Sequence, residues 1–229
     1  MEGHPEDIVP CLRCSNCYHI SSDHWNVGCS VNPRYHHQEF VPSEINLPKA
    51  ETKKHVVILG GGPAGMKAAI TASDRGHKVT IIEKQKELGG MLRFISKEAH
   101  KEEVQRLLDY YLTQIFKREI EVLLNTEADP ELVKELQPDS LLIAFGAVER
   151  ILPIPGVEGE KVQLATKAIA HPEQLGQNIV ILGGGSIGCE IGLELAENGK
   201  NVTILELTDT LAANANSLYR EALRQKFLL

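Results

Sequence analysis

The sequence lacks three features that would each assign it to a large class of proteins: a long apolar run, a basic excess and a secretory leader. No apolar stretch approaches the roughly 20 residues that cross a bilayer, so we expect no membrane partner. The formal net charge of −7 argues against nucleic acid, because a phosphate-binding surface needs basic residues. The N-terminal MEGHPED has neither the basic nor the apolar region of a signal peptide. We therefore expect a cytoplasmic protein.

Residue patterns of hydrolytic enzymes are also absent. We find no Ser–His–Asp arrangement and no pair of acids suited to hydrolysis, and the catalytic residues stay unknown. The chain is otherwise ordinary, with 229 residues, 42% of them hydrophobic and 24% charged. These values are typical of a soluble globular protein of one or two domains.

Cysteine is unevenly distributed along the chain. Four of the five cysteines form the pattern Cys11-x₂-Cys14-x₂-Cys17-x₁₁-Cys29. Crowded thiols without an export signal indicate a metal or cluster site rather than disulfides. Three close cysteines and a distant fourth suit a 4Fe–4S cluster, whereas a four-cysteine zinc site usually has two Cys-x₂-Cys pairs. The spacing favours the cluster and leaves zinc as the alternative, and we expect Cys189 to be a packed, unreactive thiol.

The chain changes character near residue 51. Residues 1–50 show no helical or strand period, which predicts an irregular cysteine-rich segment and a linker. Strands and helices then alternate, which predicts Rossmann-like α/β units. We expect strands at 55–59, 78–82, 120–124, 140–145, 178–182 and 201–205, and helices at 63–75, 98–118, 130–137, 186–198 and from 217. The predicted domains are 1–50, 51–172 and 173–229, and the last has two strands where a nucleotide-binding half normally has three.

Two glycine-rich turns of the same kind carry the strongest functional signal. The first contains Gly60, Gly62 and Gly65, and the second contains Gly183, Gly185 and Gly188. Each follows an apolar strand and opens a helix, and the next strand ends in an acid, Glu83 or Glu206. Such glycines allow a tight turn, approach of a pyrophosphate and close helix packing, and the acid accepts hydrogen bonds from ribose hydroxyls. Two such units predict electron transfer between two dinucleotides.

The acid of the second unit bears on the choice of nicotinamide cofactor. A carboxylate at Glu206 would repel the 2′-phosphate of NADPH, so we expect NADH at this site. Lys200 lies shortly before Glu206, and Lys84 follows Glu83; a positive charge beside the carboxylate would weaken this preference.

The cysteines and the two turns together resemble the C-terminal part of the iron–sulfur flavoenzymes related to old yellow enzyme. This family includes 2,4-dienoyl-CoA reductase, 2-enoate reductase and trimethylamine dehydrogenase. Besides the two turns, the matching stretches are Glu6–Cys14, Cys29–Pro33, Leu88–Gly90, Leu142–Gly146 and Pro153–Gly156. The resemblance covers nearly the whole chain.

In that family a (β/α)₈ barrel holds FMN, the cysteines hold a 4Fe–4S cluster, and a glutathione-reductase-like part holds FAD and NAD(P)H. The resemblance implies, by position, that the cluster ligands are Cys11, Cys14, Cys17 and Cys29. The residues it implies for FAD are Gly60, Gly62, Pro63, Ala64, Gly65, Glu83, Gly90 and Gly146. Those it implies for the nicotinamide cofactor are Gly183, Gly185, Ser186, Ile187, Gly188 and Glu206.

The sequence also departs from the family pattern. The FMN barrel and the late Gly-Asp flavin motif are absent, and the nicotinamide unit stops after two strands. Phe145 stands where the family's Ala-Thr-Gly has threonine. Two residues separate Cys14 from Cys17, as in trimethylamine dehydrogenase, whereas the reductases have three. We expect a fragment, or a naturally split or truncated gene product.

Three functions are consistent with these residues. The leading one is the electron-input module of an oxidoreductase, which passes electrons from NADH through FAD and a 4Fe–4S cluster to an FMN barrel. That barrel, as a domain or subunit, is the expected partner, and it would reduce an activated C=C bond in an enoate or enoyl-CoA. The second is a stand-alone NADH reductase that serves another redox protein. The third is a non-catalytic dinucleotide-binding remnant, and homo-oligomerisation is left open.

Overall fold

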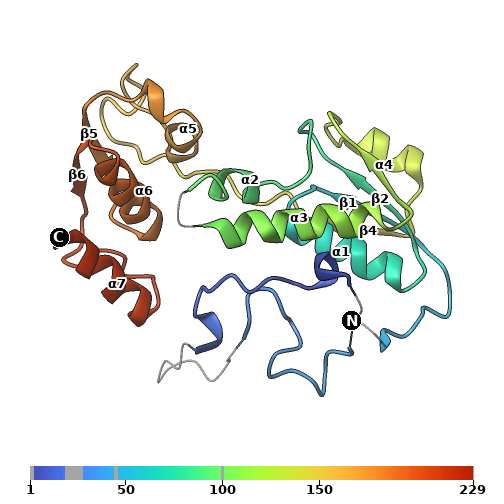
Figure 1. Ribbon diagram of the computed structural model, residues 1–229. Helices are drawn as coiled ribbons and strands as arrows, with labels where there is room; N and C mark the ends of the chain where they lie inside the picture. Colours follow the sequence, from blue (N-terminus) through green and yellow to red (C-terminus); the bar gives the residue numbers. More distant parts are fainter. Residues whose placement is uncertain (1–2, 19–27, 44–45, 99–100, 229) are drawn as a thin grey trace. The chain divides into compact units, whose positions relative to one another are not determined.

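The computed structural model describes residues 3–18, 28–43, 46–98 and 101–228 (Figure 1). The described residues group into two compact units. The first lies within residues 1–13, 29–96 and 101–148, and the second lies within 14–28, 97–100 and 149–229. No helix among the described residues is long and apolar enough to cross a membrane.

A four-stranded parallel sheet forms the centre of the first unit. Its strands are β1 (His55–Leu59), β2 (Lys78–Ile82), β3 (Ile120–Leu123) and β4 (Ser140–Ile143), in the order β3-β2-β1-β4. Val57 lies opposite Thr80 on one side and Leu141 on the other. Residues 56–59 of β1 are a continuous apolar run, and residues 79–82 of β2 are apolar except for the buried Thr80, because both faces of a parallel sheet are covered by helices. The expected Rossmann-like α/β class is confirmed.

Helices cover both faces of this sheet (Figure 1). The helices of the first unit are α1 (Pro63–Asp74), α2 (Leu92–Ile95), α3 (Glu102–Phe116) and α4 (Pro130–Leu136). Met66 of α1 and Leu108 of α3 pack with Ile58 and Ile81 on one face. On the other face Val57, Leu59 and Ile82 pack against α4. The sequence pattern missed α2, which is a single turn.

The long helix α3 differs from its prediction. Helical periodicity over 98–118 predicts one buried apolar stripe from Val104 to Phe116, but the helix spans 102–116 and Phe116 is 90% exposed. Gln114 is buried instead, and its side-chain oxygen accepts a hydrogen bond from Arg118 Nη1 at 2.7 Å. A polar residue can be buried once its hydrogen bonds are satisfied, and apolar spacing cannot reveal this.

The second unit is built on a two-stranded parallel sheet. The described elements are α5 (Ala165–Ala170), η4 (Pro172–Gln174), β5 (Asn178–Leu182), α6 (Ser186–Glu197), β6 (Asn201–Leu205) and α7 (Ser217–Phe227). α6 packs on the face that carries Ile181 and Ile204. On the opposite face Val180, Leu182 and Leu205 are exposed. The two strands expected here are therefore present, with one face of their sheet uncovered.

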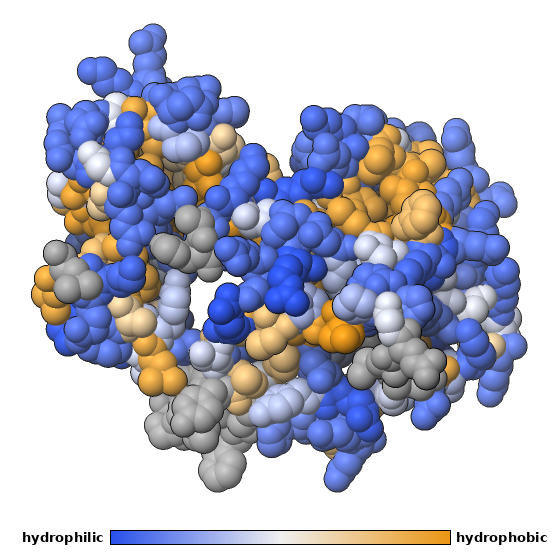
Figure 2. All heavy atoms as spheres, viewed as in Figure 1, coloured by the Kyte–Doolittle hydropathy of each residue, from blue (hydrophilic) through white to orange (hydrophobic). Residues whose placement is uncertain are grey.

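The described part of residues 3–50 contains no α-helix or strand, as the irregular composition predicts. Pro5–Asp7 and Asn16–Tyr18 form the 3₁₀ turns η1 and η2. Val9, Leu12 and Val31 pack against the core that α1 and α3 share. On the face drawn in Figure 2, apolar side chains (orange) lie exposed among polar ones (blue).

Candidate functional site

The first glycine turn connects β1 to α1, and each of its glycines has a distinct environment. Gly60 has φ +108°, and a Cβ there would lie 2.3 Å from the Ala144 carbonyl oxygen. A Cβ at Gly65 would lie 1.9 Å from the Gly60 oxygen, so glycine is required for close packing of helix on strand. A Cβ at Gly62 would meet nothing within 4 Å. The turn thus has no room for a side chain at Gly60 and Gly65, which we call closed, and has room at Gly62, which we call open.

The N-terminus of α1 is free to bind an anion. Gly62 is the N-cap, Pro63 is the first helical residue, and no side chain in the described part of the chain caps the helix. The first turn also contains no acidic residue. Because the first N–H groups of a helix have no partner within the helix, those of Ala64 and Gly65 are available to a phosphate. The residues present therefore fit the pyrophosphate of a dinucleotide.

Glu83, which follows β2, makes two contacts that the sequence did not reveal. The side chain is buried, and its Oε2 accepts a hydrogen bond from the Gly61 N–H at 2.6 Å. Its Oε1 accepts from the Gln85 N–H at 2.8 Å. The carboxylate therefore braces the glycine turn from the neighbouring strand, and its remaining lone pairs are those left for a ribose.

A second glycine loop lies against the first turn. Gly89 N–H donates to the Gly61 carbonyl at 2.8 Å. Gly90 has φ +52°, and a Cβ there would lie 3.0 Å from Gly62 Cα. Gly146, with φ +75°, follows β4 at the carboxyl edge of the same sheet. The predicted residues of the first site thus gather where α/β sheets bind their ligands.

The second glycine turn repeats this construction between β5 and α6. Gly183 has φ +108°, a Cβ at Gly185 would meet nothing within 4 Å, and one at Gly188 would lie 2.0 Å from the Gly183 oxygen. Ser186 and Ile187 are the first residues of α6, and none of the described side chains caps that helix. The arrangement again leaves the open glycine and the helix N-terminus available to a pyrophosphate.

Glu206 braces the second turn as Glu83 braces the first. Its Oε2 accepts from the Gly184 N–H at 2.7 Å, and its Oε1 accepts from the Thr208 N–H at 2.9 Å. The backbone N–H of Thr208, followed by that of Gly184, lowers the pKa of this carboxyl. A carboxylate in this position disfavours a 2′-phosphate by charge repulsion.

Lys200 does not lie near this carboxylate, although the two are close in the sequence. Lys200 precedes β6 and Glu206 follows it, so the length of the strand separates them. A strand rises about 3.3 Å per residue. Lys200 Nζ donates to the Leu175 carbonyl at 2.9 Å. The proposed weakening of NADH preference by Lys200 is therefore wrong.

A loop packs on the second glycine turn, as the loop with Leu88 and Gly89 packs on the first. Ala212 N–H donates to the Gly184 carbonyl at 2.7 Å, and a Cβ at Gly184 would lie 2.4 Å from Leu211 Cδ2. Leu88 covers Gly61 in the same way in the first unit. Both units therefore have a loop packed on the glycine turn. The residue that donates to the turn is Gly89 in the first unit and Ala212 in the second.

The structure describes all four cysteines of the N-terminal pattern, and it links none of them by a disulfide. Cys11, Cys14 and Cys17 are exposed, and Cys29 is half-buried. Cys11 and Cys29 fall in the first unit, and Cys14 and Cys17 fall in the second. The Arg13 N–H donates to Cys11 Sγ at 3.4 Å. Four thiols fit either a 4Fe–4S cluster or zinc, and their assignment as ligands stays a prediction.

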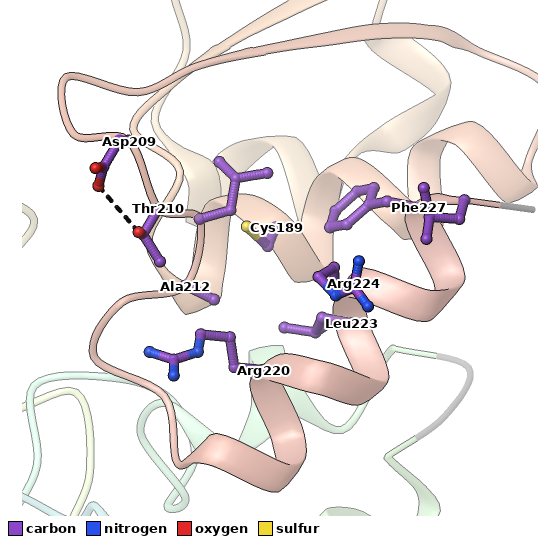
Figure 3. A pocket seen from close by; sticks show the side chains of 10 residues that line it. Cys189, Asp209, Thr210, Ala212, Arg220, Leu223, Arg224 and Phe227 are labelled. Carbon is purple, nitrogen blue, oxygen red and sulfur yellow. Dashed lines mark hydrogen bonds between the residues drawn. The ribbon is translucent and has the colours of Figure 1, made fainter.

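Cys189 is a buried thiol, as expected. It lines a cavity of about 390 Å³ between α6, α7 and the loop 209–212 (Figure 3). Its S–H donates to the Gly184 carbonyl at 3.3 Å, and burial raises its pKa. Since the thiolate is the reactive form, a thiol with a raised pKa is unreactive at neutral pH.

Comparison with known proteins identifies relatives of this chain. Residues 54–228 match the family model described as pyridine nucleotide-disulphide oxidoreductase. Cinnamate reductase of Clostridium sporogenes is 37% identical over 207 residues, which cover 90% of this chain and 30% of that protein. NADH oxidase of Thermoanaerobacter brockii is 36% identical over 234 residues, which cover 99% of this chain and 35% of that protein.

A solved structure supports the same relationship. A 2-naphthoyl-CoA reductase complexed with 2-naphthoyl-CoA matches with a TM-score of 0.90 and 33% identity, covering 99% of this chain and 34% of that one. The expected resemblance to enoate-reductase-type flavoenzymes is confirmed by these relatives. The chain spans about a third of the length of the relatives it matches. It belongs to the pyridine nucleotide-disulphide oxidoreductase family.

Proposed function

We propose that this chain is the electron-input part of an NADH-dependent flavoenzyme. Two glycine turns of the same construction carry the proposal. We call them the first cradle (residues 60–65 with Glu83) and the second cradle (residues 183–188 with Glu206). Each has an open glycine and a helix N-terminus that no described side chain caps. Bound FAD would supply the chemistry, because a flavin accepts a hydride and returns electrons one at a time. The protein would bind and orient the two cofactors.

The first cradle is assigned to FAD. Here the N–H groups of Ala64 and Gly65 would bind the pyrophosphate, and Glu83 would accept from the ribose. Gly90 lies beside the open Gly62 and adds no side chain there, which leaves room for a cofactor at the turn. The choice of flavin for this cradle rests on the family resemblance.

The second cradle is assigned to NADH. The N–H groups of Ile187 and Gly188 would bind its pyrophosphate at the start of α6. Glu206 would accept from the adenosine ribose and disfavour the 2′-phosphate of NADPH. The proposed domain boundaries follow: residues 1–50 for the cysteine segment, 51–172 for FAD and 173–229 for NADH.

The exit for electrons is assigned to Cys11, Cys14, Cys17 and Cys29 as ligands of a 4Fe–4S cluster. An FMN barrel, as a domain or subunit, would receive the electrons and reduce an activated C=C bond. This is supported by relatives named for cinnamate and 2-naphthoyl-CoA reduction and by the third of their length that the chain spans. The substrate contacts would lie in that partner.

Anaerobic purification tests the proposal. The expected product is brown, contains FAD, iron and acid-labile sulfide, and loses its flavin absorbance on addition of NADH. A colourless protein that takes up neither flavin nor iron would contradict it. Zinc at one atom per chain, without dye reduction by NADH, would instead indicate a non-catalytic remnant.

A stand-alone NADH reductase is the second candidate, because NADH oxidase is among the relatives. Co-purification separates the two functions. A barrel protein retained in a one-to-one ratio supports the electron-input role. Rapid NADH-dependent reduction of a dye or of oxygen without any such partner supports the stand-alone reductase.

A further inference from the structure

The backbone beside Cys11 adopts a conformation that side-chain-bearing residues rarely use. Arg13 has φ +51°, in the left-handed region. In this conformation its N–H points at Cys11 Sγ, 3.4 Å away. Because a residue with a Cβ does not adopt such a conformation without cost, other contacts must hold Arg13 in place.

Glu103 supplies such a contact from the first turn of α3. Its Oε1 lies 2.5 Å from Arg13 Nη2. The Glu103 side chain is 14% exposed while that of Arg13 is 70% exposed, so the acid is the fixed partner. Its Oε2 is buried and has no hydrogen bond to any residue that the structure describes, and Arg106 Nη1 lies 3.8 Å from it.

The two ends of this contact rest on one core. Leu107 and Leu108 of α3 belong to the core of the first unit. Val9 and Leu12, on either side of Cys11, pack against the same core. The segment before Arg13 and helix α3 are therefore both fixed by packing on one core, and the ion pair between Glu103 and Arg13 links them.

We propose that Glu103 is a positioning residue for the cluster assigned to Cys11. It holds Arg13 so that the backbone N–H faces the cysteine sulfur. Hydrogen bonds to the sulfurs set the reduction potential of iron–sulfur clusters, because they stabilise the more negative, reduced state. This inference rests on the proposed function, since it requires a cluster at Cys11.

The reduction potential of the cluster tests the inference. Glu103→Gln is compared with Glu102→Gln, an exposed neighbour on the same helix turn, by a redox titration monitored by electron paramagnetic resonance. Both variants lose one negative charge, and that loss alone would raise the potential. Loss of the hydrogen bond from the Arg13 N–H to Cys11 Sγ would lower the potential, so the potential of Glu103→Gln is expected to lie below that of Glu102→Gln. A potential equal to or above that of the control overturns the inference.

Hydrogen exchange in the cluster-free whole chain gives a second readout. The amide of residue 13 is expected to exchange faster in Glu103→Gln and Arg13→Ala than in the wild type, Glu102→Gln or Arg106→Ala. Arg13 is mostly exposed, so its variant keeps the core intact. Unchanged exchange in both Glu103→Gln and Arg13→Ala would refute the positioning role and leave the proposed function intact. A wild-type chain that binds no iron would refute the proposed function.

Discussion

Gly65 and Gly188 each lie where a Cβ would come within about 2 Å of a backbone carbonyl oxygen, whereas Gly62 and Gly185 face open space. Identical residues in one motif therefore have different functions. The closed glycines allow the fold, and the open ones allow a ligand to approach. Substitution at the two kinds of position should separate folding from binding.

Alanine at the open and closed glycines of the first turn makes this testable. Gly65→Ala is expected to lower the free energy of unfolding by about 1–3 kcal/mol, because its methyl group overpacks the turn. Gly62→Ala should leave stability nearly unchanged, since φ is −74° and the space is open, but weaken FAD binding about tenfold, or about 1.4 kcal/mol. Urea unfolding and FAD titration measure the two effects. Equal loss of stability in both variants would contradict this division.

Glu206 is a second single residue with a testable role, because its charge is expected to favour NADH over NADPH. Glu206→Gln removes the charge that opposes a 2′-phosphate, so the affinity for NADPH relative to NADH is expected to rise about tenfold. Because the carboxyl pKa is lowered, the wild-type preference should persist at pH 5. Calorimetric titration with both dinucleotides measures the ratio, and Glu197→Gln at the end of α6 is the control. An unchanged ratio would show that another residue discriminates.

At the scale of elements, α3 joins the N-terminal segment to the first unit. Lys117, which follows α3, pairs with Glu6 and Asp7 at 3.1 and 2.7 Å. Gln114 of α3 donates to Asp7 at 2.7 Å. The 3₁₀ turn η1 is therefore tied to the helix by its two acids, and we call this contact the N-terminal tether.

The N-terminal tether should depend on pH with a defined sign. A backbone N–H, followed by His4 and Lys117, lowers the pKa of Glu6 to about 2, and Lys117 lowers that of Asp7. A carboxyl whose pKa falls on folding contributes stability above its unfolded value, near 4.5 for Glu6, and loses it as the pH drops through the folded value. The tether is therefore expected to weaken between about pH 4.5 and 2.

Hydrogen exchange at residues 5–9, corrected for its intrinsic pH dependence, measures the strength of the tether. Exchange should be faster at pH 3 than at pH 6 relative to β1. Lys117→Met should reproduce the change at pH 6, and Lys134→Met on α4 should not. Exchange that stays slow in Lys117→Met would show that Val9 and Leu12 hold the segment without the ion pairs.

At the scale of the whole molecule, the two dinucleotide units differ in completeness. The first has four strands with helices on both faces, and the described part of the second has two strands with an exposed face. Buried apolar area supplies most of the stability of a domain. The second unit should therefore open more easily.

Limited proteolysis compares the two units in the whole chain. The first cuts are expected within residues 178–228, while fragments containing 55–143 persist. Added NADH should slow the cuts in the second unit, because a ligand stabilises the state it binds. Equal protection of both units without ligand would contradict the difference in stability.

Local patterns determined much of this protein. The strands 55–59 and 78–82, the helix beginning at Pro63 and both glycine turns follow from periodicity and turn chemistry within about 30 residues. The two-strand second unit is visible in the same way. These features depend on neighbours in the sequence, so tertiary contacts were not needed to predict them.

Tertiary structure decided which side chains meet one another, whatever their separation in the chain. Glu83 and Glu206 brace the turns 22 residues before them. Phe116 is exposed although helical periodicity predicts it in the buried stripe, and Glu103 pairs with Arg13. The two braces form because neighbouring parallel strands end at the same sheet edge, whereas the Glu103–Arg13 pair forms because the N-terminal segment packs on the core that contains α3. Local sequence patterns therefore predict where the two glycine turns and their acids lie, and the fold decides which side chains hold the turns in shape, because side-chain pairing depends on three-dimensional proximity.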